Sequence, residues 1–334
     1  MGADRGVSGG RGRRRVLSRM AEHLFWLGRY LERAEDSARL ADVEYYAAIE
    51  ALPHGAGDAA LWEPVLAATG LLDDYRAVAS TSSPATFFLL DHANPSSIRS
   101  SVGKARELAR VCREFLPREA WEELNVLYLW LQPIDALEHV TLSELTGRVR
   151  RSAWVLQSLL DHATPHDEGY QWFRAGLFLE RADMLTRFVD AKQPALLPHG
   201  LGAGGFDPGL QWAAVLRAAS AWQAFRRTAR AEVSGPAVIA FLLLDRAFPR
   251  SLLFALSALG DALQRASATA RLSYLASARA LLAALQLELE SVSAPELMAR
   301  SLHEYMDELQ RRLISLNDAL TASAFRALPE PAAP

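Results

Sequence analysis

The sequence GRYLERAE, at residues 28–35, is the stretch from which the rest of the chain is interpreted. A closely related sequence, GLFLERAD, occurs at residues 176–183. Both follow the pattern G-x-x-L-E-R-A-[E/D], and both lie in long segments whose apolar residues recur every three or four positions. This spacing places apolar side chains on one face of a helix. The repeated acid–base pair indicates an internal duplication and marks the candidate functional centre.

The same periodicity extends over most of the chain and predicts an all-α protein. No run of alternating apolar and polar residues is bounded by turn signals, so we predict no strands. We expect helices at about 18–50, 58–79, 85–91, 96–115, 117–131, 134–162, 166–193, 208–230, 236–247, 250–268, 270–290 and 294–322.

Further matching positions keep their order in the two halves. Residues 52–55 and 197–200 both read LPHG, and a Leu-Leu-Asp run precedes a proline and a serine in residues 89–97 and in residues 243–251. We therefore expect a large helical bundle of two related repeats, at about 17–130 and 166–290, with pseudo-two-fold symmetry. The repeat is too long for a short-period solenoid.

Composition and charge bound the class of protein. Of the 334 residues, 50% are hydrophobic and 22% are charged, which is typical of a globular chain. Residues 1–15 hold five arginines and one aspartate and are predicted to be a disordered basic tail. Residues 16–325 are predicted to form a single helical domain, and residues 326–334 a disordered end. The net charge of −3 includes the basic tail, so the body is acidic, which argues against a nucleic-acid partner.

Cysteine usage and hydropathy bear on the compartment. A single cysteine, Cys112, excludes an internal disulfide and fits a reducing compartment. The longest apolar run, residues 237–244, is too short to span a membrane, and no apolar run of signal-peptide length follows the basic N-terminus. We therefore predict a soluble cytoplasmic protein without a membrane partner.

Glu180 is expected near the middle of the apolar face of its helix. A buried carboxylate without a partner would be costly, so Glu180 needs a cation. Arg181 is the next residue on the same helix and points about 100° away from Glu180. It cannot be that cation, because only residues three or four apart on a helix face each other. A glycine one turn before each glutamate, Gly28 and Gly176, leaves room for a partner side chain or for a close backbone.

We therefore expect the glutamates and arginines to pair between the two repeats. Glu32 is predicted to pair with Arg181, and Glu180 with Arg33. One interpretation is a buried ionic network that locks the two halves together. The other is a ligand or catalytic site at the pseudo-two-fold axis. We favour the lock.

Asp91 and Asp245 also occupy matching positions, each at the end of a Leu-Leu-Asp run. Capping and turn chemistry would explain both aspartates. The alternative is that they line the same central cleft together with Arg99. The candidate central site thus comprises Gly28, Glu32, Arg33, Asp91, Arg99, Gly176, Glu180, Arg181 and Asp245.

No metal site and no cofactor are predicted. Di-iron centres in helical bundles use Glu-x-x-His on two helices, and no histidine here has a glutamate three positions before it. The sequence also contains no P-loop, no dinucleotide fingerprint, no nucleophile elbow and no paired-cysteine motif.

The opening of the chain resembles a known family. Residues 17–35, LSRMAEHLFWLGRYLERAE, closely resemble the start of the bacterial alpha-E domain family, which is all-helical and named for its Glu-Arg motif. Residues 241–251, FLLLDRAFPRS, resemble its later signature, and the similarity covers about 16–320. Members often begin at the position of Val16, so the translation start is left open between Met1 and Val16.

The resemblance implies which proteins this chain works with, but it does not imply a reaction that the chain itself catalyses. Such proteins look like companions of a circularly permuted ATP-grasp ligase and a transglutaminase-like peptidase, which implies a role in peptide or amide-bond formation. No catalytic residue is carried over, and the Glu-Arg positions transfer only as the family's signature.

Three functional hypotheses remain. The leading one is a non-catalytic partner that binds the ligase, or its peptide substrate, near the Glu-Arg centre. The second is an enzyme, such as an acyl or aminoacyl transferase, with Glu32 or Glu180 as acid or base and Arg33 or Arg181 holding a carboxylate or phosphate. The third is a purely structural helical scaffold.

Overall fold

The structure is a computed structural model in which the described residues are 18–51, 58–135, 137, 139–196, 208–228, 232–267, 275–299 and 301–325. The predicted tails at 1–15 and 326–334 and both LPHG loops lie outside these ranges. The described residues form helices joined by turns, with no strand among them, so the predicted all-α fold is confirmed. None of the helices in the described ranges is long and apolar enough to cross a membrane.

The α-helices are α1 (Ser18–Ala51), α2 (Asp58–Ala68), α3 (Leu72–Val78), α4 (Pro84–Leu89), α5 (Ile98–Val111), α6 (Arg118–Leu131), α7 (Leu142–Ala163), α8 (Glu168–Leu196), α9 (Pro208–Ala218), α10 (Trp222–Thr228), α11 (Gly235–Ile239), α12 (Leu252–Ala266), α13 (Ala276–Ser291), α14 (Ala294–Ala299) and α15 (Leu302–Leu320). A 3₁₀ turn, η2 (Arg113–Phe115), follows α5, and two π-helical turns, η3 (Ala240–Leu244) and η6 (Thr321–Phe325), follow α11 and α15.

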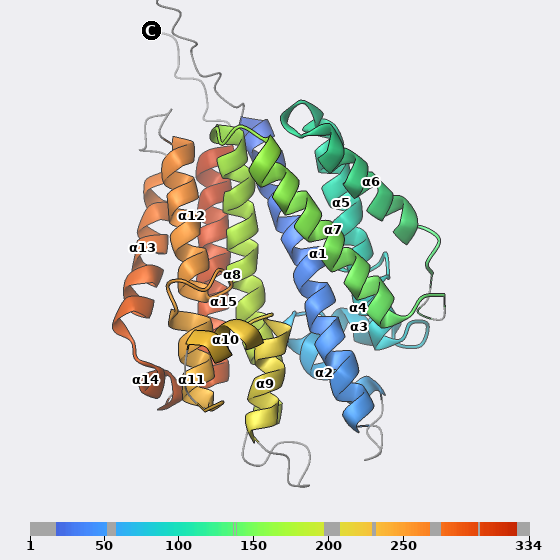
Figure 1. Ribbon diagram of the computed structural model, residues 1–334, viewed down its shortest axis with the longest axis vertical. Helices are drawn as coiled ribbons and strands as arrows, with labels where there is room; N and C mark the ends of the chain where they lie inside the picture. Colours follow the sequence, from blue (N-terminus) through green and yellow to red (C-terminus); the bar gives the residue numbers. More distant parts are fainter. Residues whose placement is uncertain are drawn as a thin grey trace, which may run out of the picture.

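Two long helices, α1 and α8, form the centre of the bundle. They pack against each other along their length, with α5 and α7 on the outer side of α1 and α12 and α15 on the outer side of α8 (Figure 1). Between Gly169 and Ala191, only Arg174 and Arg187 are partly exposed. A helix that is buried on nearly every side must lie inside the fold, which is why both copies of the motif occupy the core.

Two of the expected helices are each broken by a residue in the left-handed region. In the segment expected at 58–79, α2 ends shortly before Gly70, whose φ is +71°, and a separate helix, α3, begins after it. In the segment expected at 208–230, α9 ends shortly before Ser220, whose φ is +49°, and α10 begins after it. A left-handed residue is a common way to end a helix, and serine adopts this conformation less readily than glycine.

Other boundaries also differ from the expectation. The segment expected from 134 begins only at Leu142, where the hydroxyl of Thr141 caps the amide of Glu144. The segment expected at 294–322 is divided into α14 and α15, and Ser301 caps the second of these. Helix α8 continues past Pro194 to Leu196, because a proline near a helix end removes few backbone hydrogen bonds.

Candidate functional site

The site begins with two glycines at which α1 and α8 touch. A Cβ atom at Gly28 would overlap the carbonyl oxygen of Phe173, and a Cβ atom at Gly176 would overlap that of Phe25. The backbones are therefore too close for any residue larger than glycine. This contact brings the glutamate one turn after each glycine within reach of the opposite helix.

Glu180 is fully buried and is held by two arginines of α1. Arg29 donates from Nε to Oε2 at 2.6 Å. Arg33 donates from Nε to Oε1 at 2.5 Å and from Nη2 to Oε2 at 3.1 Å. The predicted pairing of Glu180 with Arg33 is confirmed, and Arg29 is an additional partner.

Glu32 has the reciprocal arrangement on α1. Arg181 of α8 donates from Nε to Oε1 at 2.5 Å and from Nη2 to Oε2 at 3.0 Å, which confirms the second predicted pair. The amide of Gln157 on α7 donates to the same carboxylate at 3.0 Å. The Nη1 atom of Arg181 also donates to the carbonyl oxygen of Pro249, so the pair is linked to the segment before α12.

The network continues along α1 through Glu35 and Asp36. Arg250, in the turn before α12, pairs with Glu35 at 2.5 Å and with Asp36 at 2.8 Å. Arg39 also pairs with Glu35, and the indole of Trp154 on α7 donates to Glu35 at 2.7 Å. One continuous set of ion pairs therefore connects α1, α7, α8 and the start of α12.

The ion pairs decide the charge states at the centre. Burial alone would raise the pKa of Glu180, but Arg29 and Arg33 outweigh burial and hold it at about 2. Burial also opposes the ionisation of Glu35, yet Arg250 and Arg39 lower its pKa to about 2. A carboxylate with so low a pKa is a weak general base at neutral pH.

Asp36 behaves in the opposite way. Burial and the repulsion of Glu32 and Glu35 raise its pKa, and the charges of Arg250 and Arg39 only partly offset this rise, so that the pKa is about 7. Asp36 therefore holds a proton more readily than Glu35 or Glu180.

The other predicted site residues lie elsewhere. Asp91 accepts a hydrogen bond from the backbone amide of Ala93 at 2.8 Å, and Asp245 accepts from the backbone amides of Ala247 and Phe248. Both aspartates therefore have the turn geometry that was one of their two interpretations. Arg99 is buried on α5, where it donates to the carbonyl oxygen of Leu131. Among the described residues, none of the three pairs with the Glu-Arg network.

Several members of the network were missed from the sequence, namely Arg29 as a partner of Glu180, Gln157, Trp154, Arg39 and Arg250. Arg250 had a visible signal, because it follows Pro249 in the second segment that resembles the family. Gln157 and Trp154 had none, because nothing in the sequence of α7 shows which turn faces Glu35.

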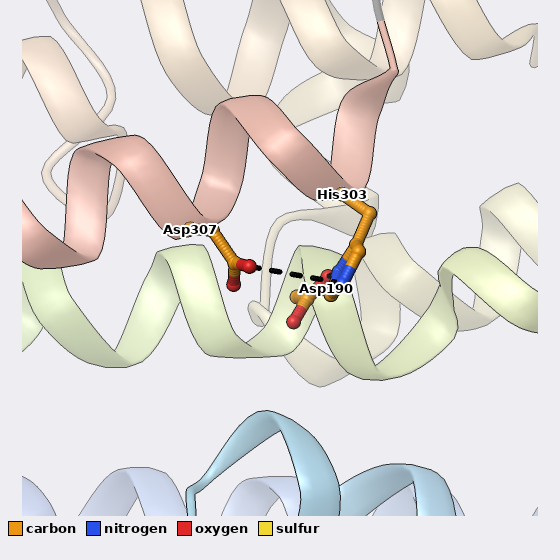
Figure 2. Close-up of side chains that lie close together, drawn as sticks. All are labelled: Asp190, His303 and Asp307. Atoms are coloured by element: carbon orange, nitrogen blue, oxygen red, sulfur yellow. Dashed lines mark hydrogen bonds and ion pairs between the residues drawn. The ribbon is translucent and has the colours of Figure 1, made fainter.

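A second polar cluster lies between α8 and α15 and was also missed. His303 Nδ1 lies 2.6 Å from Asp190 Oδ1, and His303 Nε2 lies 3.7 Å from Asp307 Oδ2 (Figure 2). Asp190 is buried, whereas His303 and Asp307 are about half exposed. The potential ligand atoms lie within 4.8 Å of one another, so the three residues could hold an ion, although their hydrogen bonds and ion pairs already account for the arrangement.

Comparison with known proteins agrees with the motif and the fold. A family model described as a predicted alpha-helical domain with a conserved ER motif matches residues 16–325. No curated protein and no solved structure matches the chain.

Proposed function

The chain belongs to the Alpha-E family, and from this premise we propose that it is a non-catalytic helical partner of an ATP-grasp amide ligase. The ligase as partner, and the transglutaminase-like peptidase beside it, come from the resemblance of the opening motif. The geometry of the Glu-Arg centre supports the non-catalytic part of the proposal.

One observation carries that part: both motif glutamates are fully buried, and both oxygens of each already accept hydrogen bonds from arginines, with Gln157 as a further donor to Glu32. Glu180 accepts three hydrogen bonds from Arg29 and Arg33, and Glu32 accepts from Arg181 and Gln157. Their side chains are at most 1% exposed. An acid or base must reach the proton that it transfers, and neither carboxylate has a free approach. The centre is suited to hold four helical segments in fixed positions.

A rigid body of this kind can present a constant surface to an enzyme. In some proteins, buried and fully hydrogen-bonded polar groups fix one arrangement of the helices even where they add little net stability. We infer that the family's motif is a structural lock, and that binding takes place outside it.

Reconstitution with the purified ligase tests the proposal. We expect the full chain and the ligase to form a complex at micromolar concentration in gel filtration with light scattering, and we expect the complex to change the ligase's turnover of ATP and carboxylate substrate. Absence of a complex together with unchanged turnover would overturn the partnership.

The enzyme hypothesis is tested in the same system. The purified chain alone should make no amide product. If it made one, and if Glu180→Gln abolished the product while circular dichroism and the melting temperature stayed unchanged, the catalytic interpretation would replace the proposal.

A further inference from the structure

A cavity on the α5 side of α1 lies outside the Glu-Arg lock. Its volume is about 770 Å³, within the range of about 300–1,000 Å³ that is usual for small-molecule sites. The lining residues come mainly from α1 and α5, with others from the turn before α5 and from the end of α6. Among them are Glu22, Trp26, Tyr30, Arg99, Lys104 and Tyr128.

The ammonium group of Lys104 is the first cation of this cavity. It donates to the carbonyl oxygen of Pro95 at 3.1 Å and lies 5.2 Å from the centre of the Tyr30 ring. No carboxylate of the described residues lies within ion-pair distance of it. Lys104 is one of only two lysines in a chain with 36 cationic residues, so a compact ammonium at this place departs from the chain's general use of arginine.

Arg99 is the second cation, and it is only 5% exposed. One of its terminal nitrogens donates to the carbonyl oxygen of Leu131, and the other faces His92 at 3.2 Å. Its Nε atom has no hydrogen-bond partner among the described residues. Its nearest carboxylate, Asp135, is 3.6 Å away and largely exposed, and such a pair contributes little.

The acidic lining residues do not neutralise these cations. Glu107 is already paired with Arg106 at 3.1 Å and with Arg110 at 3.0 Å. With Asp135 facing Arg99 and with both arginines sharing Glu107, the cavity and its immediate partners hold four cations, Lys104, Arg99, Arg106 and Arg110, against three carboxylates, Glu22, Glu107 and Asp135, a surplus of one positive charge with the histidines taken as neutral. A surplus of this size suits a singly charged anion and not a polyanion such as a nucleoside triphosphate.

The neighbouring lock adds to the positive field. Arg29 and Arg33 share the single carboxylate of Glu180, and Arg33 lies close enough to Lys104 to act on its charge. Burial lowers the pKa of Lys104, and the charge of Arg33 lowers it further. A bound anion would relieve this repulsion.

Aromatic side chains form the remaining wall. The ring centres of Trp26 and Tyr30, both on α1, lie 5.6 Å apart, and Tyr128 of α6 also lines the cavity. Such rings bind planar or apolar groups by stacking and by burial of their surface. The cavity thus combines two cations with an aromatic wall.

We propose that this cavity binds a small monocarboxylate with a planar or apolar body, with Lys104 and Arg99 holding the carboxylate and with Trp26, Tyr30 and Tyr128 contacting the body. The inference is independent of the ligase partnership, because the site and its test involve this chain alone.

Isothermal titration calorimetry of the full chain with N-acetylphenylalanine tests the proposal. Its uncharged amide differs from it only at the carboxylate and should bind about tenfold more weakly or not at all, because a charge-assisted hydrogen bond is lost. Binding should also weaken as salt is added. Equal affinity for the acid and the amide, or no binding of the acid at up to about 10 mM, would overturn the proposal.

Two variants locate the site. Lys104→Gln changes an exposed residue of the cavity and should weaken binding by about tenfold. Arg113→Gln removes an exposed cation from the 3₁₀ turn η2 that follows α5, outside the cavity, and should leave binding unchanged. Equal effects of the two variants would contradict the assignment. Tighter binding of phenyl phosphate than of N-acetylphenylalanine would replace the carboxylate by a phosphate as the preferred group.

Discussion

Arg181 of α8 holds Glu32 of α1 by two parallel hydrogen bonds of 2.5 and 3.0 Å. The same two helices are joined in the reverse sense where Arg33 of α1 donates to Glu180 of α8. Each helix thus supplies both an acid and a base to the other, and the two pairs lie one turn after Gly28 and Gly176, where the helix backbones touch.

Replacing Glu180 by glutamine should strongly destabilise the protein. The substitution leaves the buried Arg29 and the partly buried Arg33 without the carboxylate that they share, and removing one partner of a buried ion pair typically costs about 3–5 kcal/mol. We expect the free energy of unfolding in urea to fall by about 3 kcal/mol. The matched control is Glu122→Gln, which breaks an exposed pair with Arg118 and should change nothing measurable. A Glu180→Gln protein as stable as the wild type would refute the structural lock.

Replacing Gly176 by alanine tests the close helix contact. The added methyl group would overlap the backbone carbonyl of Phe25, so the helices must separate. We expect a loss of at least about 2 kcal/mol, measured by thermal or urea unfolding. In Gly103→Ala the new Cβ would lie 3.9 Å from its nearest neighbour, Tyr128, so this control should be neutral or stabilising by about 0.5–1 kcal/mol. Similar losses in both variants would mean that helical glycines matter here for a reason other than the contact.

The cluster between α8 and α15 should make stability depend on pH. The hydrogen bond to Asp190 raises the pKa of His303, and burial raises the pKa of Asp190. Both groups bind protons more tightly in the folded state than in the unfolded state. Their contribution is therefore complete at low pH, and it declines as the pH rises, above about 4 for Asp190 and above about 6.5 for His303.

Chemical denaturation between about pH 6 and pH 8 measures the contribution of His303. The wild type should lose stability over this interval more steeply than His303→Gln, which cannot titrate there. His139→Gln changes an exposed histidine outside the cluster and should keep the wild-type slope. The same slope in His303→Gln and in the wild type would show that the raised pKa does not act on folding.

Part of the Glu-Arg network could be derived from the sequence, because the physical reasons for those pairs lie in the local helix geometry. The period of the apolar residues places Glu180 on a buried face, and the geometry of a helix turns Arg181 away from it. A buried acid then needs a partner from another helix, and the repeated motif supplies one. The pairs Glu32–Arg181 and Glu180–Arg33 follow from that argument, and the structure contains both.

The remaining partners could not be derived in this way. Arg29 lies three residues before Glu32 on the same helix, yet it reaches Glu180 on the other helix. Arg250 approaches Glu35 and Asp36 from a turn that lies far away in the sequence. The position of such side chains depends on how far one helix slides and rotates against the next, and periodicity leaves both quantities open.

The sequence by itself determined that this protein is all-helical, that Glu180 lies on a buried face, and that the two Glu-Arg motifs pair with each other. These conclusions rest on the period of the apolar residues and on the cost of an unpaired buried charge, which are properties of the local chain. Only the tertiary structure decided that the acids are saturated, that Asp91 and Asp245 serve turns, and that Arg99 and Lys104 line a separate cavity beside the lock. These outcomes depend on packing between helices that are distant in sequence, where a shift of one turn exchanges one set of partners for another.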